Sequence, residues 1–152
     1  MQPAAQDLLR KIELQTAVLV RNLEMIRRRG DFYQEVDRSG YLILRTLSRE
    51  GTMDIGSLSD KLGLDPSTVG RQVNSLEKSG KVIKRQDQQD LRRFLAEATS
   101  EGLEAMQKVR DRRLEGTAHL LQAWDEEEVT ALETTLSHFN ESIEQRFLRK
   151  KK

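Results

Sequence analysis

The sequence contains no cysteine, so disulfides, thiolate chemistry, cysteine-type zinc sites and thiol-based redox sensing are excluded. Histidine is scarce too, because His119 and His138 are the only two and fall on different predicted helices. No G-x-S-x-G, P-loop or H-E-x-x-H motif occurs, and the carboxylates lie among Lys and Arg as solvated charge pairs do. We therefore expect no enzyme, no catalytic residue, no cofactor and no metal site.

Long apolar runs are also missing. No stretch approaches the ~20 residues that a membrane span requires. The N-terminus, MQPAAQDLLRKIEL, lacks the basic start and the apolar core of a signal peptide. The sequence therefore predicts a cytoplasmic protein without a membrane partner.

Aromatic residues make up only 5% of the 152 residues, whereas 34% are charged and 36% are hydrophobic. The apolar residues are periodic, so disorder is not expected. This composition suits long helices with solvated faces, and a monomer of this kind would have a thin core. Burial of one helical face against a second subunit is the usual remedy.

Proline occurs only at positions 3 and 66, so little interrupts helix formation. Periodicity and capping residues predict helices at 5–29, 40–49, 54–62, 66–79, 99–124 and 126–148, and strands at 82–85 and 93–98. The predicted N-caps are Asp54, Asp65, Thr99 and Asp125, the last with Glu128 in a capping box. The expected fold class is mainly α with a small β-hairpin (α+β).

The expected organisation is a compact centre, residues 38–98, between long amphipathic helices. Residues 1–37 form an N-terminal helix and connector, residues 99–148 form C-terminal helices, and residues 149–152 form a basic tail. The terminal helices 5–29 and 126–148 each carry an apolar stripe that so small a centre cannot fully cover. The stripes therefore predict a homodimer, with packing of the two helices within one chain as the alternative.

Charge is unevenly distributed along the chain. Residues 66–96 carry seven basic and three acidic side chains, whereas the whole chain has a net charge of +1. This region contains the second of two short helices that are joined by a tight turn at Gly63, a helix-turn-helix geometry whose second helix can lie in a DNA major groove. Gly70 costs ~1 kcal/mol in a helix interior relative to Ala, which makes sense if something approaches closely. The alternative is an ordinary solvated helix face.

The two strands after this helix form a hairpin whose tip, residues 86–92, carries Arg92 beside Asp90. Arginine suits the negative potential of a narrow minor groove, and a charge-assisted bond to Asp90 can orient the guanidinium. The alternative is a surface hairpin with incidental charges.

These motifs together resemble the winged helix-turn-helix of MarR-family transcription regulators, over about residues 38–104. The resemblance rests on the helix start LGLDPSTV, on LEKSG, on a basic strand, on a D-x-x-D-x-R wing and on the closing TSEG. Three departures stand out. Leu91 replaces a frequent Arg, Gly70 replaces a polar residue, and Ala96 and Ala98 replace larger apolar ones.

The resemblance implies a winged helix-turn-helix flanked by dimerisation helices, and a homodimeric repressor that binds a pseudo-palindromic double-stranded DNA operator. The expected DNA-binding residues are Ser67, Thr68, Gly70, Arg71, Gln72, Asn74, Ser75, Lys78, Lys84, Arg85, Asp90, Arg92 and Arg93. Within this set, Asp90 is expected to orient Arg92.

The resemblance also implies a small phenolic or lipophilic effector, for which the candidate residues are Phe32, Tyr33, Tyr41, His119 and Trp124. Core or interface packing is the alternative role of these aromatic residues. Two other functions stay open. A metal-dependent regulator would need ligands from two histidines and scattered acids. A winged helix that contacts proteins instead of DNA would be favoured by an exposed Leu91.

Overall fold

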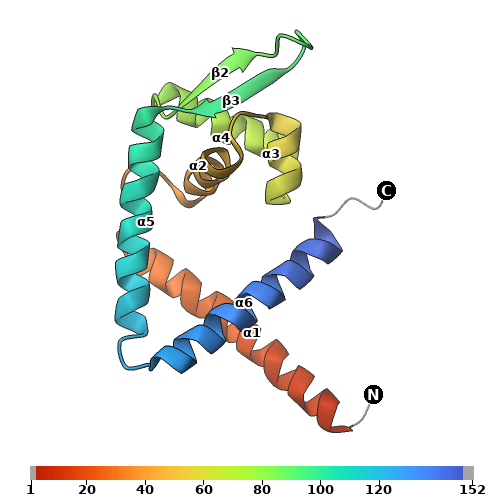
Figure 1. Ribbon diagram of the computed structural model, residues 1–152, viewed down its shortest axis with the longest axis vertical. Coiled ribbons are helices and arrows are strands. Elements are labelled where there is room, and N and C mark those ends of the chain that lie inside the picture. The colour runs from red at the N-terminus through yellow and green to blue at the C-terminus, as the bar shows by residue number, and fades with distance from the viewer. Residues whose placement is uncertain (1–2, 149–152) are drawn as a thin grey trace. The chain divides into compact units, whose positions relative to one another are not determined.

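The helices and the small sheet that the sequence predicts are all present in the computed structural model, which describes residues 3–148 (Figure 1). In chain order the elements are α1 (Pro3–Arg29), α2 (Arg38–Glu50), β1 (Met53–Asp54), α3 (Ile55–Leu62), α4 (Pro66–Lys78), β2 (Val82–Gln86), β3 (Phe94–Ala98), α5 (Ser100–Leu120) and α6 (Glu126–Phe147). α1 with the residues up to Phe32 forms one unit, and the chain from Tyr33 onward forms a second. The basic tail predicted at residues 149–152 lies outside the described residues.

The first unit is the single helix α1. Arg27, Arg28 and Arg29 occupy its last turn, where cations oppose the negative end of the helix dipole. The N–H of Gly30 closes the helix by donating to the Ile26 carbonyl at 2.7 Å. Apolar side chains along α1 remain exposed, with Leu8 at 60% exposure. The helix therefore carries an apolar stripe that its own unit does not bury.

The core of the second unit lies between the three short helices, the sheet and the first half of α5. Its fully buried large side chains come from five different elements and are Ile43, Leu44, Leu58, Val69, Val73, Val82 and Val109. α6 is different, because none of its described side chains is buried. No helix within residues 3–148 is both long and apolar enough to cross a membrane.

The sheet is antiparallel with strand order β1–β3–β2. β1 was not predicted, because two residues are too few to show an alternating pattern. It pairs with β3 at Met53↔Ala96, and the same Ala96 pairs with Lys84 of β2 on its other side. Met53 packs against the core beside this pairing, so a neighbouring side chain borders the small Ala96.

The four predicted N-caps are confirmed, including the capping box of Asp125 and Glu128. Asp37 is a fifth cap that the sequence pattern did not predict, and it starts α2 at Arg38 instead of Gly40. The predicted helix through Trp124 was wrong, because α5 ends at Leu120 and Trp124 lies in the turn before α6. β3 begins at Phe94, which leaves Arg93 in the hairpin loop.

Candidate nucleic-acid interface

The turn between α3 and α4 sets the direction of α4. Gly63 adopts a left-handed conformation with φ +65°, which glycine reaches without a Cβ penalty, and it ends α3. Asp65 then caps α4, and Pro66 occupies the first turn, where its missing N–H removes no helical bond. Local chemistry therefore sets the end of α3, the turn and the start of α4.

α4 buries one narrow face and exposes the rest. Val69 and Val73 are fully buried and Leu76 is 5% exposed. The side chains of its predicted DNA-binding set lie outside this stripe, either exposed or half-buried, and are Ser67, Thr68, Arg71, Gln72, Asn74, Ser75 and Lys78. The structure thus collects these polar groups on the outer surface of one helix.

Asp65 organises the first turn of α4. Its carboxylate accepts from the Thr68 N–H at 3.1 Å and from the Thr68 hydroxyl at 2.6 Å, and it also accepts from the Ser67 hydroxyl. These bonds, with those of the two hydroxyls largest, hold the pKa of Asp65 well below its usual range. The hydroxyl protons of Ser67 and Thr68 therefore point to Asp65, and Thr68 Oγ1 in turn accepts from Arg71 at 3.5 Å.

Gly70 faces open space. A Cβ built at this position would meet no atom within 4 Å, so packing inside the chain does not require glycine there. A role of Gly70 toward a partner that approaches α4 from outside stays a prediction.

Gln72 borders a groove of about 470 Å³ between α4 and the connector before α2. Its Oε1 is buried and finds no hydrogen-bond partner among the described residues. The groove also includes Asp37, Gly40 and Leu76.

Lys84 joins the sheet to α4. Its ammonium donates to Asn74 Oδ1 at 2.7 Å and lies 3.6 Å from a Glu77 carboxylate oxygen. Arg85 points to the other face of the hairpin and pairs with Glu97 across the strands at 2.9 Å. Lys84 and Arg85 thus both have hydrogen-bond or ion-pair partners within the protein. The partners of Lys84 lie on the outer face of α4.

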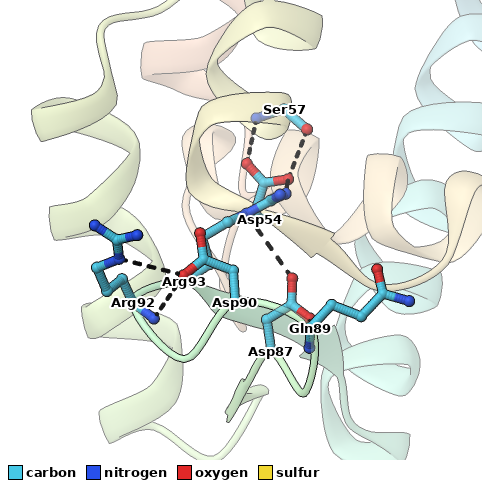
Figure 2. Close-up of polar contacts among 7 residues, drawn as sticks. All are labelled: Asp54, Ser57, Asp87, Gln89, Asp90, Arg92 and Arg93. Atoms are coloured by element: carbon cyan, nitrogen blue, oxygen red, sulfur yellow. Dashed lines mark hydrogen bonds and ion pairs between the residues drawn. The ribbon is translucent and has the colours of Figure 1, made fainter.

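The hairpin loop ends in two neighbouring arginines with different surroundings (Figure 2). The side chain of Arg92 is 92% exposed, and its Nε lies 3.6 Å from Asp90 Oδ1. That Asp90 oxygen also accepts the Arg92 backbone N–H at 3.1 Å. Asp90 therefore orients the backbone of Arg92 by a hydrogen bond and its guanidinium by a looser ion pair.

Arg93 turns the other way, toward the body of the domain (Figure 2). It donates to Asp54 Oδ2 at 2.5 Å and lies 3.9 Å from Asp87 Oδ2. The pKa of Asp54 is lowered to about 2, chiefly by the Ser57 backbone N–H, with the Ser57 hydroxyl and Arg93 adding to it. Sequence reasoning did not single out Asp87 or a role for Asp54 beyond its cap, since the pairing spans 39 residues.

Two of the predicted effector residues meet in the structure. The rings of Tyr33 and Tyr41 pack edge to face with centroids 6.1 Å apart. The guanidinium of Arg113, which the sequence pattern did not single out, lies 5.9 Å and 5.4 Å from these two centroids and donates to the Tyr33 hydroxyl. His119, in the last turn of α5, and Trp124, beyond its end, are exposed. No group of three potential metal-ligating side chains is found within the described residues.

Comparison with known proteins gives consistent matches. Residues 37–94 match the model of the MarR family. The chain is 29% identical over 108 residues to an uncharacterized HTH-type transcriptional regulator, YxaD of Bacillus subtilis (strain 168), over 71% of this chain and 76% of YxaD.

Solved structures share the fold. A MarR family protein from Bacillus stearothermophilus superposes with a TM-score of 0.70 at 21% identity, over 94% of this chain and 98% of that one. NadR in complex with 4-hydroxyphenylacetate superposes with a TM-score of 0.56 at 18% identity, over 86% of this chain and 89% of NadR. At these identities the structures establish the winged-helix fold with its long terminal helices.

Proposed function

We propose that this chain is a MarR-family transcription regulator, and more narrowly a homodimeric, sequence-specific repressor that binds double-stranded DNA. In this proposal it is a DNA-binding regulator and not an enzyme. The finer proposal rests on one observation. α4 buries only its apolar stripe, and its polar outer face belongs to the same compact unit as a hairpin whose Arg92 is 92% exposed.

α4 is the recognition helix in this proposal. Arg71 and Lys78 supply positive charge to phosphates, and Asn74 and Ser75 face the base edges of the major groove. Gln72 joins them when its side chain turns out of the groove in which its Oε1 is buried. Ser67 and Thr68 lie at the start of the helix. Because their hydroxyl protons are bonded to Asp65, these hydroxyls offer lone pairs, as acceptors, to the DNA. Gly70 lets the duplex approach the helix backbone.

The hairpin is the wing. Arg92 enters the minor groove beside the α4 site, where a narrow groove concentrates negative potential. Asp90 orients Arg92 before binding. Lys84 and Arg85 add positive charge at the base of the wing, although each has a partner within the chain.

The homodimer rests on unburied apolar stripes. α6 carries Leu136 at 40% exposure and Phe139 at 44%, and α1 carries Leu8 at 60%. A second copy that covers such stripes gives an isologous interface. Its two-fold axis places the recognition helices about one DNA turn apart, ~34 Å, which predicts a pseudo-palindromic operator.

An effector would act through the aromatic cluster of Tyr33, Tyr41 and Arg113. Two rings and a guanidinium suit a small phenolic molecule with an acidic group, as in the 4-hydroxyphenylacetate bound by NadR. His119, in the last turn of α5, and Trp124, just beyond it, remain candidates. Relief of repression requires that the effector prefers a dimer geometry that does not fit the operator.

The direct test is fluorescence anisotropy with the duplex upstream of the protein's own gene and a scrambled duplex, over a salt series. Wild type should prefer the upstream duplex, and log affinity should fall with log salt by ~0.9 per phosphate neutralised. Arg92→Ala should weaken binding and lower this slope by about one phosphate. Arg49→Ala is the charge-matched control, because Arg49 lies at the end of α2 and pairs with Glu50.

Weak binding to both duplexes that does not depend on Arg92 would overturn the proposal. The winged helix would then be a protein-contact module, and exposed Leu91 and Phe94 on the hairpin would be the first surface to probe.

A further inference from the structure

We infer that Arg93 is a positioning residue that latches the wing to the start of α3 and thereby sets the direction of Arg92. This inference rests on the proposed DNA-binding function, which it deepens. The sequence alone does not distinguish the roles of Arg92 and Arg93, because the two residues are adjacent and identical.

The wing loop is tied together internally. The Asp87 N–H donates to the Arg93 carbonyl and the Arg93 N–H to the Asp90 carbonyl, each at 2.9 Å. The Asp87 side chain accepts from the Gln89 N–H at 2.9 Å, and the Gln86 amide donates to the Leu91 carbonyl at 2.6 Å. These bonds fix the conformation of the loop. What remains free is the orientation of the loop relative to the domain, which depends on how far strands β2 and β3 can twist.

Those strands give it little lateral support. β1 pairs with β3 only at Ala96 and Leu95, so the outer end of the hairpin, Gln86↔Phe94, is a two-stranded ribbon. Two-stranded ribbons twist more than wider sheets and are only marginally stable alone. A wing built this way can swing unless a side chain ties it back to the domain.

Arg93 connects the wing to the domain through Asp54, whose carboxylate is itself held in place by hydrogen bonds. Asp54 caps α3 by accepting the Ser57 N–H at 2.9 Å and the Ser57 hydroxyl at 2.7 Å, and it receives Arg93 at 2.5 Å. The Asp54 side chain is only 19% exposed, and Asp87, 16% exposed, flanks the guanidinium from the loop side. One arginine thus bridges a helix cap and the wing loop (Figure 2).

The latch acts on the neighbouring residue. With Arg93 held against Asp54, the Arg92 side chain extends to the opposite side of the loop (Figure 2) and is 92% exposed. Without the latch, the orientation of the hairpin would have to be fixed when DNA binds, and that loss of freedom reduces affinity. Arg93 itself needs no phosphate contact for this effect.

The test is a double-mutant cycle on the upstream duplex with Arg93→Ala, Arg92→Ala and both together. We expect Arg93→Ala to weaken binding about two- to tenfold, the range for ordering a few groups at an interface. In the Arg92→Ala background it should cause no further loss. Full additivity of the two losses would show that Arg93 contacts DNA itself and would overturn the latch.

Asp54→Asn tests the latch from its other end. Asparagine is also a good N-cap, so α3 should keep its start while the charged bond to Arg93 is lost. This variant should lose as much affinity as Arg93→Ala, and the double variant no more than either single. Arg93→Lys should recover part of the affinity, and Arg49→Ala is again the control. Wild-type affinity for Asp54→Asn would contradict the inference.

A readout without DNA separates the latch from the proposed function. Amide order parameters from NMR relaxation should fall at Leu91 and Arg92 in Arg93→Ala and stay unchanged in α4. If the free wing stays as ordered as wild type, the latch does not exist. If the wing loosens but wild type binds no DNA, the latch is real and the proposed function fails instead.

Discussion

Arg112 of α5 forms two parallel hydrogen bonds with Glu35 in the connector before α2. Nη1 donates to Oε2 at 2.6 Å and Nη2 donates to Oε1 at 2.5 Å. The residues are 77 positions apart. Forked arginine–carboxylate pairs are among the stronger charge-assisted bonds, and this one ties the connector to the long helix. The bond from Arg112 lowers the pKa of Glu35 from 4.5 to about 2.

This pair predicts a pH-dependent stability difference. A depressed pKa contributes stability above the unfolded value, 4.5, and the contribution is lost as pH falls toward about 2. Glu35→Gln should therefore unfold at lower urea than wild type at neutral pH. The gap should close between pH 4.5 and about 2. Glu13→Gln, on the exposed face of α1, is the control and should show no comparable gap. A gap that persists at the acid end would mean that the carboxylate charge is not its source.

Removal of the Thr99 hydroxyl should lower the stability of the fold without altering the proposed DNA-binding surface. This hydroxyl accepts from the Gly102 N–H at 3.0 Å and donates to the Gly80 carbonyl at 2.7 Å, so it caps α5 and fastens the turn after α4. Thr99→Ala should cost ~1 kcal/mol of unfolding free energy by urea denaturation. Thr99→Ser keeps the hydroxyl and should stay close to wild type. Equal losses in the two variants would point to the methyl group instead.

Gly70 predicts opposite effects on stability and on DNA affinity. Alanine meets no atom within 4 Å and is the better helix former, so Gly70→Ala should stabilise the fold by ~1 kcal/mol. The same methyl group stands on the face of α4 that is proposed to approach DNA, so the anisotropy assay should show weaker binding. Unchanged affinity would remove Gly70 from the proposed interface.

Gly102 is the matched contrast. A Cβ there would lie 2.0 Å from the Lys81 carbonyl oxygen, which is backbone and cannot rotate away. Gly102→Ala should therefore lower the melting temperature, as overpacking in a core does. If it melts like wild type, the start of α5 is looser than its contacts indicate.

The stripe on α6 predicts the oligomeric state. Leu136→Asp places a charge in the surface that the proposed dimer would bury, so light scattering should report a fall from twice 17.5 kDa to 17.5 kDa. Affinity for the operator should fall as well, because a monomer has one recognition helix and can occupy only one of the two half-sites. Thr134→Asp lies on the opposite face of α6 and should remain a dimer. A wild-type monomer would rule out this interface.

Local patterns predicted much of this protein. Asp54, Asp65, Thr99 and Asp125 were identified as caps from sequence, because a capping side chain bonds to backbone only two or three residues away. The helix 66–79 was predicted from apolar residues at three- and four-residue spacing, which a helix places on one face. The helix-turn-helix therefore follows from interactions between residues that are close in the chain.

Elements made by distant partners do not follow from such local patterns. β1 is two residues long and exists because β3 lies beside it. The end of α5 was placed too late, because a helical apolar pattern continues through Leu121 and Trp124 although the turn before Asp125 stops the helix.

The clearest division lies between the two adjacent arginines of the wing. Sequence alone predicted a hairpin behind a polar helix, with Arg92 in its tip and Arg93 at the start of its second strand, since turn chemistry and strand pattern are local. Only the tertiary structure decided that Arg93 turns in to Asp54 while the Arg92 side chain is 92% exposed. The reason is physical. The direction of a side chain depends on which charges the fold brings near it, and Asp54 is 39 residues away along the chain.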